Sequence, residues 1–213
     1  MALYPNEMAC ILSHRKAWET FLKSDADWAI FCEDDVHFSP AAAKVVACLR
    51  VPANELCVLR LETFRSSVVL SRESETICDR SIRTMHSNQG GAAAYLLNRL
   101  TAEALVAAMP DMRHAVDVEM FDPERRSMRN LEVRQLDPAI CIQDGILNRF
   151  SPRLVSNILE RSDVDSGLFK EPRRDAVAMT AEAVLSVGRA LKNHIQSLNY
   201  RKDGKMRRVI PFA

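Results

Sequence analysis

The sequence predicts an α/β domain in which helices flank a mixed sheet. Three observations predict this class: short apolar runs bounded by polar turns, an amphipathic helical pattern near the N-terminus, and a strand, an acidic loop and a helix in succession over residues 28–49. The 213 residues are 47% hydrophobic and 27% charged, which is enough for one good core and a small appendage.

Charge and hydropathy limit which partners and which cellular location we expect. Lys and Arg (29) balance Asp and Glu (28), so the global charge gives no indication of nucleic-acid binding, and we expect none. No apolar stretch approaches the length of a membrane span, and the first seven residues lack the profile of a signal peptide. A cytoplasmic location is therefore expected.

An amphipathic helix is predicted for residues 7–23. Ile11, Trp18 and Phe21 recur there at helical spacing, and Asn6 precedes the helix as its expected N-cap. The apolar residues give the helix one face to bury. We expect this face to lie against the core.

The acidic loop lies between a strand and a second helix. Residues 28–32 form an apolar run that predicts a buried strand, after a polar turn that separates it from the first helix. Pro40 fits the first turn of a helix over residues 41–49, because the N–H that proline lacks has no partner there anyway.

The next hundred residues predict five further extended pieces, one helix and one loop or weak hairpin. Residues 71–80 are polar and charged, and we expect a loop or a weak hairpin there. A helix over residues 101–108 is stopped by Pro110. The extended pieces are expected at residues 57–61, 68–70, 92–97 and, around Pro138, 133–136 with 139–142.

The sequence pattern changes beyond about residue 150, from short apolar runs to a long helical pattern. We therefore divide the chain into a core, residues 1–150, and a helical C-terminal extension, residues 151–213. Residues 176–198 show a long helical pattern. A basic tail follows, and near an anionic membrane it favours peripheral contact, with apolar help from Ile210 and Phe212. A solvated tail is the alternative. The basic residues are Arg201, Lys202, Lys205, Arg207 and Arg208.

The six cysteines are scattered and form no Cys-x-x-Cys pair. Most lie in apolar contexts, which favours free buried thiols over a disulfide framework in a chain of this size. They are Cys10, Cys32, Cys48, Cys57, Cys78 and Cys141.

Three adjacent carboxylates, Glu33, Asp34 and Asp35, end the strand of residues 28–32. Adjacent carboxylates repel one another, and a divalent cation relieves that repulsion. The carboxyl ends of strands are also where α/β proteins place their ligands. We therefore predict a metal site, with an acidic loop that only caps the next helix as the alternative.

Several spaced motifs together resemble glycosyltransferase family 25, the bacterial lipopolysaccharide galactosyltransferases and their collagen-modifying relatives. The resemblance covers roughly residues 3–150. Because separate motifs agree in order, it is more specific than one acidic triplet. The motifs are residues 8–18 (MACILSHRKAW), 28–36 (WAIFCEDDV), 91–97 (GAAAYLL), 116–119 (VDVE) and 138–143 (PAICIQ).

The resemblance implies a GT-A-like (Rossmann-like) fold and inverting transfer of galactose from UDP-galactose to a lipopolysaccharide core. It also implies Mn²⁺ or Mg²⁺ bridging the carboxylates to the diphosphate. Glu33 and Asp35 have D-x-D spacing, so in a strand their side chains leave on one side while Asp34 points away.

Inverting transfer needs a general base for the acceptor hydroxyl. Asp117 and Glu119 are the candidates, because strand-like alternation would point both carboxylates to one face. A solvated strand edge or the start of a helix is the alternative.

Six further residues are candidate substrate contacts. The Ser-His pair in the first helix is expected to face the site, as the family motif implies. The alternative is that the histidine is buried and has only a structural role. Two glycines allow close approach of the backbone to a ligand, or form a turn before a strand. The candidates are Ser13, His14, Glu62, Gly90, Gly91 and Gln143.

The family resemblance also implies an opening strand, helix and strand before the Ser-His helix, whereas this chain begins almost at that helix. We therefore expect an N-terminally shortened sheet with an exposed edge and an incomplete nucleotide pocket. A homo-oligomer would cover such an edge. A catalytically degenerate member that binds a glycan or a partner protein is the alternative function.

Overall fold

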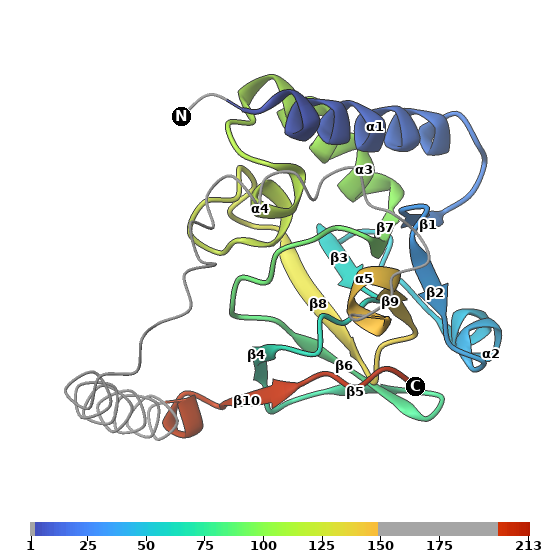
Figure 1. The fold of residues 1–213 in the computed structure, drawn as a ribbon, viewed down its shortest axis with the longest axis vertical. Helices are drawn as coiled ribbons and strands as arrows, with labels where there is room; N and C mark the ends of the chain where they lie inside the picture. Colours follow the sequence, from blue (N-terminus) through green and yellow to red (C-terminus); the bar gives the residue numbers. More distant parts are fainter. Residues whose placement is uncertain (1–2, 149–199) are drawn as a thin grey trace, which may run out of the picture.

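The computed structural model describes residues 3–148 and 200–213. Helices and strands are interspersed in this part of the chain, with β3 to β7 following one another without a helix between them (Figure 1). The helices are α1 (Pro5–Leu22), α2 (Ala42–Cys48), α3 (Arg99–Ala108), η1 (Met109–Asp111), α4 (Val116–Phe121) and α5 (Asp144–Leu147). The strands are β1 (Trp28–Cys32), β2 (Val36–Phe38), β3 (Cys57–Arg60), β4 (Ser67–Ser71), β5 (Glu75–Ile77), β6 (Arg80–Thr84), β7 (Ala94–Asn98), β8 (Glu132–Asp137), β9 (Cys141–Gln143) and β10 (Lys205–Val209).

A mixed six-stranded sheet, in the order β1-β7-β3-β8-β6-β5, forms the centre of the described structure. β3 and β8 are parallel, and the other neighbours are antiparallel. Two short ribbons, β2 with β9 and β4 with β10, complete the strand pairing. The mixed α/β class predicted from the sequence is therefore confirmed.

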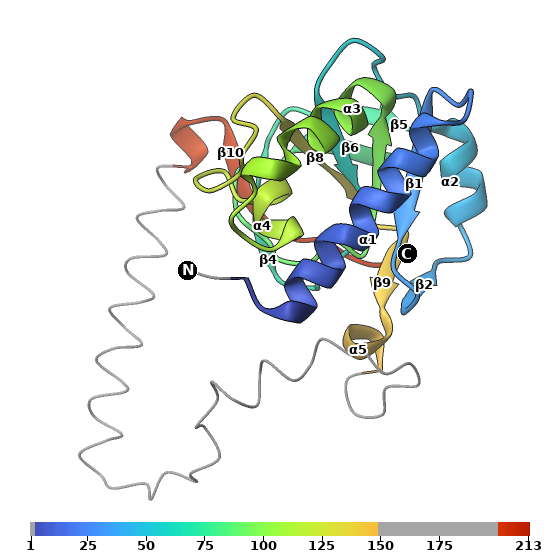
Figure 2. The same ribbon diagram turned by 90° about the horizontal axis from the view of Figure 1, so that it is seen from above.

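The sheet separates two hydrophobic clusters, because successive side chains of a strand point to opposite faces. On β3, Val58 joins the cluster that contains Trp18 of α1, whereas Leu59 joins the cluster that contains Val45 of α2. Figure 2 shows α1 and α3 together over one part of the sheet, with α2 apart from them beside β1. This packing fixes α1 above the carboxyl end of β1.

The first helix begins one residue before the expected cap. Tyr4 is the N-cap, and its backbone N–H donates to the Glu7 carboxylate at 2.9 Å. Pro5 takes the first helical position, where its missing N–H costs nothing. Asn6 therefore lies inside the first turn, and its prediction as the cap is wrong.

Strand pairing over long sequence distances accounts for the elements that the sequence left uncertain. The stretch of residues 71–80 forms part of a hairpin, β5 with β6, so the hairpin is the correct one of the two expectations. The sequence analysis did not anticipate β2. Its three residues pair antiparallel with β9, more than a hundred residues later.

The C-terminal tail pairs with the core as a strand, while its basic side chains Arg201, Lys202, Arg207 and Arg208 stay exposed to solvent. β10 pairs antiparallel with β4, and Ile210 is only 1% exposed. Arg208 Nε lies 2.6 Å from Asp137 Oδ2. Ile210 is thus unavailable for membrane contact, because the fold buries it. The helix predicted at residues 176–198 lies outside the described residues, and none of the described helices is long and apolar enough to cross a bilayer.

One pair of cysteines is bonded. A disulfide joins Cys48, at the end of α2, to Cys78, in the turn between β5 and β6, with the two Cα atoms 6.3 Å apart. The expectation of free thiols is therefore wrong for this pair, because packing brings together two segments that are 30 residues apart. The free cysteines are Cys10, Cys32, Cys57 and Cys141.

Candidate functional site

The acidic triplet forms the tight turn between β1 and β2. Gln143, at the end of β9, reaches this turn and donates through Nε2 to Glu33 Oε2 at 3.2 Å and to Asp35 Oδ2 at 3.2 Å. Asp35 is buried, whereas Asp34 is exposed. Glu33 and Asp35 therefore converge on one amide, as their spacing predicted, while Asp34 points elsewhere.

The surroundings of Asp35 disfavour its charged form. Burial is the main cause that raises the pKa of this carboxyl, and the negative charges of Glu33 and Asp34 add to it, against the hydrogen bond from Gln143. A cation held by Glu33 and Asp35 would reverse this effect. Carboxylate oxygens with a nearby amide are donors of the type that Mg²⁺ and Mn²⁺ prefer, so these residues fit such an ion.

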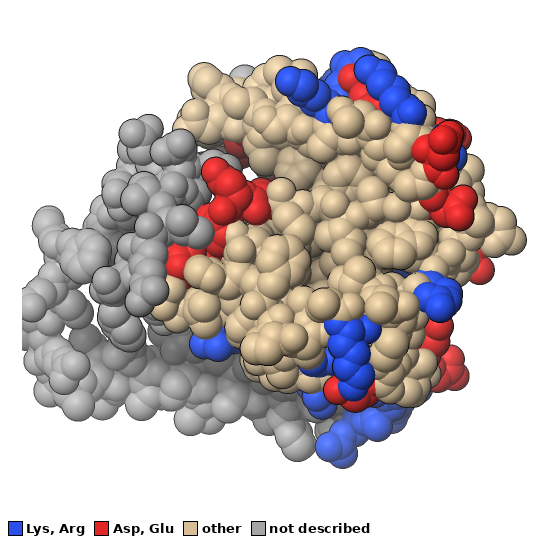
Figure 3. Space-filling view, turned by 90° about the vertical axis from the view of Figure 1, so that its right-hand side faces the viewer, with Lys and Arg blue, Asp and Glu red and all other residues tan. Residues whose placement is uncertain are grey.

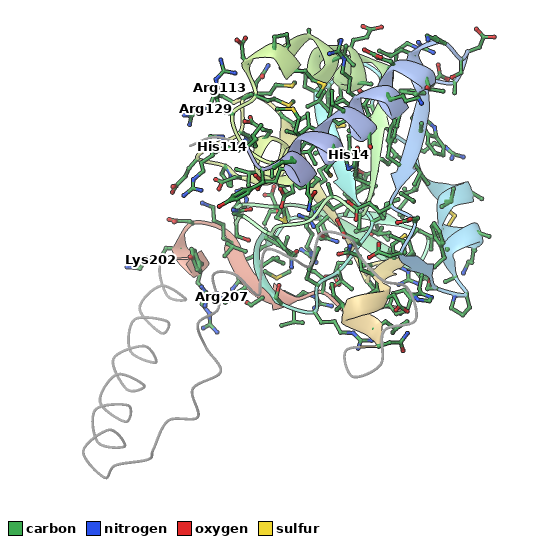
Figure 4. The ribbon with its side chains drawn as sticks, turned by 45° about the horizontal axis from the view of Figure 1, so that its top comes forward. His14, Arg113, His114, Arg129, Lys202 and Arg207 are labelled. Atoms are coloured by element: carbon green, nitrogen blue, oxygen red, sulfur yellow. A yellow bond between two sulfur atoms is a disulfide. The ribbon has the colours of Figure 1, made fainter. Side chains whose placement is uncertain are left out.

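His14 faces the acidic turn from α1. Its Nδ1 lies 2.6 Å from the Tyr95 hydroxyl, which also accepts a hydrogen bond from Trp18 Nε1 at 2.8 Å. Its Nε2 lies 3.8 Å from Glu33 Oε1. Figure 4 shows His14 on α1, well apart from Arg113, His114 and Arg129, which lie beside α4. The expectation of a histidine that faces the site fits this position.

Ser13 does not share that position. It is exposed, and no hydrogen bond to the other site residues is found for it in the described structure. Adjacent residues of a helix point roughly 100° apart, so His14 and Ser13 cannot face the same pocket. The prediction of a paired contact is wrong for Ser13.

Cys10 lies beside His14 on the same face of α1, and the sequence analysis did not single it out. Burial raises the pKa of its thiol to about 11, and the carboxylates of Glu33 and Asp117 contribute to the shift. Cys10 is thus close to both acidic segments. Its spacing of four residues from His14 on a predicted helix is the sequence feature that could have identified it.

Asp117 is held against a glycine turn. Its Oδ2 accepts a hydrogen bond from the Gly91 N–H at 2.8 Å. Gly91 has a φ of +84°, and a Cβ there would meet the Phe64 ring at 2.1 Å, while a Cβ on Gly90 would meet Asp117 Oδ2 at 3.2 Å. The two glycines therefore allow close approach to the protein's own side chains, and they form the turn that leads into β7.

Glu119 lies on another side of α4 and organises a loop. It is 2% exposed and accepts hydrogen bonds from the backbone N–H groups of Arg113 at 2.7 Å, His114 at 2.8 Å and Ser127 at 3.2 Å. The alternation that suggested two carboxylates on one face assumed a strand, whereas Val116–Phe121 is a helix. We therefore reject Glu119 as a general base.

Glu62 is buried and cannot be a surface contact for a sugar. Its Oε1 accepts from Arg60 Nη2 at 3.1 Å and from the Ala93 N–H at 3.0 Å. Burial raises its pKa from 4.5 to about 7, although Arg60 acts in the opposite direction. Arg60 itself is fully buried and donates to the Gln89 carbonyl at 2.5 Å. The pair ties β3 to the glycine turn.

The sequence matches the model of glycosyltransferase family 25, described as an LPS biosynthesis protein, over residues 2–120, which is more than half of the chain. The protein belongs to glycosyltransferase family 25. The matched residues contain the acidic turn, His14 and Asp117 and stop before Gln143. The glycosyltransferase expected from the motifs is confirmed at this level.

Two curated relatives come from Haemophilus influenzae. The chain is 26% identical over 152 residues to a protein named "Putative glycosyltransferase", an alignment that covers 70% of this chain and 53% of the relative. It is 25% identical over 219 residues to the lipooligosaccharide biosynthesis protein lex-1, which covers 97% of this chain and 69% of that protein. The chain thus matches about half of the first relative and about two thirds of the second.

The face of this glycosyltransferase family 25 protein that carries β1, β2 and α2 is mostly uncharged. Figure 3 shows a compact group of acidic side chains at its left, separated by uncharged surface from the mixed charges along the top, right and lower edges. An acidic site can bind an anionic ligand once a cation is bound there, because the cation reverses the local charge.

Proposed function

We propose that this protein transfers a hexose, galactose, from a UDP-sugar to a hydroxyl group of a lipopolysaccharide acceptor, with inversion at the anomeric carbon. The observation that carries the proposal is the convergence of Glu33 and Asp35 on Gln143, in a protein of glycosyltransferase family 25. His14 Nε2 lies 3.8 Å from Glu33 Oε1, and the charges of both Glu33 and Asp117 raise the pKa of the nearby Cys10 thiol, which supports placing Asp117 in the same acidic region.

Glu33 and Asp35 would hold Mn²⁺ or Mg²⁺. When bound, such an ion supplies positive charge for the diphosphate of the donor and its leaving group. Gln143 keeps the two carboxylates together through Nε2, and Asp35 is fixed by burial. His14 is oriented by Tyr95, so that Nε2 is directed to the edge of this site.

Asp117 is the proposed general base. The Gly91 N–H donates to Asp117 Oδ2 and the Val118 N–H donates to Oδ1, and Asp117 is only partly buried, so its carboxylate is held in place and remains accessible to an acceptor. It accepts the proton of the acceptor hydroxyl as that oxygen bonds to the anomeric carbon of the sugar. The bond from this carbon to the UDP oxygen breaks, and its electron pair leaves with UDP.

The test is release of nucleoside diphosphate from a panel of UDP-sugars, measured with and without Mn²⁺. We expect release from UDP-galactose in the presence of the ion and an acceptor. Asp35→Asn should abolish Mn²⁺-dependent binding of UDP in calorimetry and leave the protein folded, because it removes a charge without opening a cavity.

Asp34→Asn is the matched control. Asp34 is exposed and is the residue next to Asp35, so this variant removes an equal charge from outside the proposed ligand pair. It should retain UDP binding. Equal binding by wild type and Asp35→Asn would rule out the metal role. UDP binding without turnover of any sugar would instead favour the catalytically degenerate, glycan-binding or partner-binding module.

A further inference from the structure

A second group of cation ligands lies on the α1 side of Glu33. One ligand atom from each of Cys10, His14 and Glu33 lies within 4.8 Å of those of the other two. Cys10 and His14 are four residues apart in α1 and therefore share one face of the helix. Glu33 approaches them with Oε1, which lies 3.8 Å from His14 Nε2.

The spacing of these atoms is close to that of a four-coordinate site. Bonds of about 2.0 to 2.3 Å from Zn²⁺ to oxygen, nitrogen and sulfur place neighbouring tetrahedral ligands roughly 3.5 Å apart. Cys10 and Glu33 are only partly buried, so small rotations of their side chains can close the remaining distance. The same partial exposure leaves a fourth position for water.

His14 is already held in an orientation for ligation. The Tyr95 hydroxyl at Nδ1 leaves Nε2 as the nitrogen that faces Glu33, and Trp18 fixes the tyrosine oxygen in turn. When a cation occupies Nε2, the ring proton lies on Nδ1 and is donated to the Tyr95 oxygen. Hydrogen bonds of this type orient histidine ligands in metal sites and strengthen their binding.

The donor types separate this group from the carboxylates of the acidic turn. A thiolate and an imidazole select cations such as Zn²⁺ and Co²⁺, whereas Mg²⁺ prefers oxygen ligands alone. The two oxygens of Glu33 also have different partners. Oε1 faces His14, whereas Oε2 accepts a hydrogen bond from Gln143, which also donates to Asp35.

We infer that Cys10, His14 and Glu33 form a binding site for a thiophilic divalent cation such as Zn²⁺, with its fourth coordination position open to solvent. Binding replaces the thiol proton of Cys10, which is released to solvent, and joins α1 to the end of β1. This site shares Glu33 with the Mn²⁺ or Mg²⁺ site proposed above, but its test measures cation binding alone and requires no sugar transfer.

Titration of the metal-free full chain with Co²⁺ tests the site directly. We expect one equivalent of Co²⁺ to produce thiolate-to-metal charge-transfer absorption with a tetrahedral visible spectrum. Cys10→Ser should abolish the charge-transfer band. Cys32→Ser should retain it, because Cys32 is a free cysteine next to Glu33 that is not part of the ligand group. Tyr95→Phe should weaken Co²⁺ binding about 10-fold to 100-fold.

A second measurement uses the wild-type protein, so that it does not depend on a variant's folding. Zn²⁺ should protect Cys10 from alkylation, as read by mass spectrometry, while exposed Cys32 serves as the internal control. A band that persists in Cys10→Ser, equal alkylation of Cys10 with and without Zn²⁺, or displacement of Co²⁺ by a modest excess of Mg²⁺ would each overturn the inference.

Discussion

The acidic turn and α4 each carry two candidate-site carboxylates two residues apart, and only the acidic turn brings its pair together. In the turn between β1 and β2, Glu33 and Asp35 both accept from Gln143. In α4, Asp117 accepts from the Gly91 N–H, whereas Glu119 is buried against the loop that surrounds the helix.

The difference lies in the backbone. Glu33 and Asp35 lie in the turn that follows β1, where Gln143 can donate to both, whereas residues two apart in a helix point roughly 200° apart. The same spacing in the sequence therefore gives a shared ligand site in the first segment and two separate roles in the second. In α4 one carboxylate faces the glycine turn and the other stabilises a loop.

The largest expected effect is a loss of activity on substitution of Asp117, which distinguishes its role from that of Glu119. Asp117→Asn should lower kcat by about 10²-fold to 10⁴-fold, because the general base is lost. The amide oxygen can still accept from Gly91, so the free energy of unfolding should change little. Steady-state kinetics with a UDP-sugar and urea denaturation measure the two quantities. A kcat within tenfold of wild type would contradict the assignment.

Glu119 should show the opposite pattern, with a large effect on stability. Glu119→Ala leaves three backbone N–H groups without their acceptor, and we expect the free energy of unfolding to fall by about 3 kcal/mol. Glu119→Gln keeps an acceptor oxygen and should lose less. Urea denaturation of both variants is the measurement, and a loss below about 1 kcal/mol in the alanine variant would refute the loop role.

Glu62 adds a buried carboxyl whose charge is sensitive to pH. Its pKa is raised by burial from 4.5 to about 7, so the folded protein binds this proton more tightly than the unfolded chain does. Its contribution to the free energy of unfolding therefore falls as pH rises from 4.5 to about 7 and is constant above that range.

Glu62→Gln removes this titration. The difference in free energy of unfolding between wild type and Glu62→Gln should therefore shift against wild type by on the order of 3 kcal/mol across that interval. Urea denaturation at several pH values measures the difference. A difference that is constant from pH 4.5 to about 7 would show that the pKa of Glu62 is not raised.

The smallest effect is expected at Ser13. Ser13→Ala should change the free energy of unfolding by less than about 0.5 kcal/mol and leave kcat unchanged, since the residue is exposed. His14→Ala is the matched comparison and should reduce nucleotide binding. If Ser13→Ala instead reduced binding as much as His14→Ala, the neighbouring side chains would act together after all.

Much of the fold follows from local pattern. The apolar period of residues 7–23 gave α1, and the apolar runs gave β1, β3 and β7, because buried faces impose a regular spacing on the sequence. Gly91 also has a local explanation, since its positive φ and the Phe64 ring exclude a side chain. The boundaries shifted by one or two residues, since the capping contacts of Tyr4 and Asn98 set them.

Other elements depend on partners that are distant in the sequence. β2 exists through β9, and β10 through β4, so neither three residues of β2 nor a basic tail could indicate a strand alone. The disulfide between Cys48 and Cys78 likewise requires α2 and the β5–β6 turn to meet. In each case the stabilising partner is supplied by the packed core.

The sequence by itself determined the α/β class, the family and the position of the acidic turn at the end of β1, because these depend on local periodicity and on motifs in order. Only the tertiary structure decided how those residues are used. It placed Gln143 within hydrogen-bonding distance of both Glu33 and Asp35, and it brought Cys10 and His14 close to the Glu33 carboxylate. It also directed the Glu119 side chain of α4 toward a neighbouring loop. The direction of a side chain and its distant neighbours follow from helix rotation and strand pairing, which no local pattern contains.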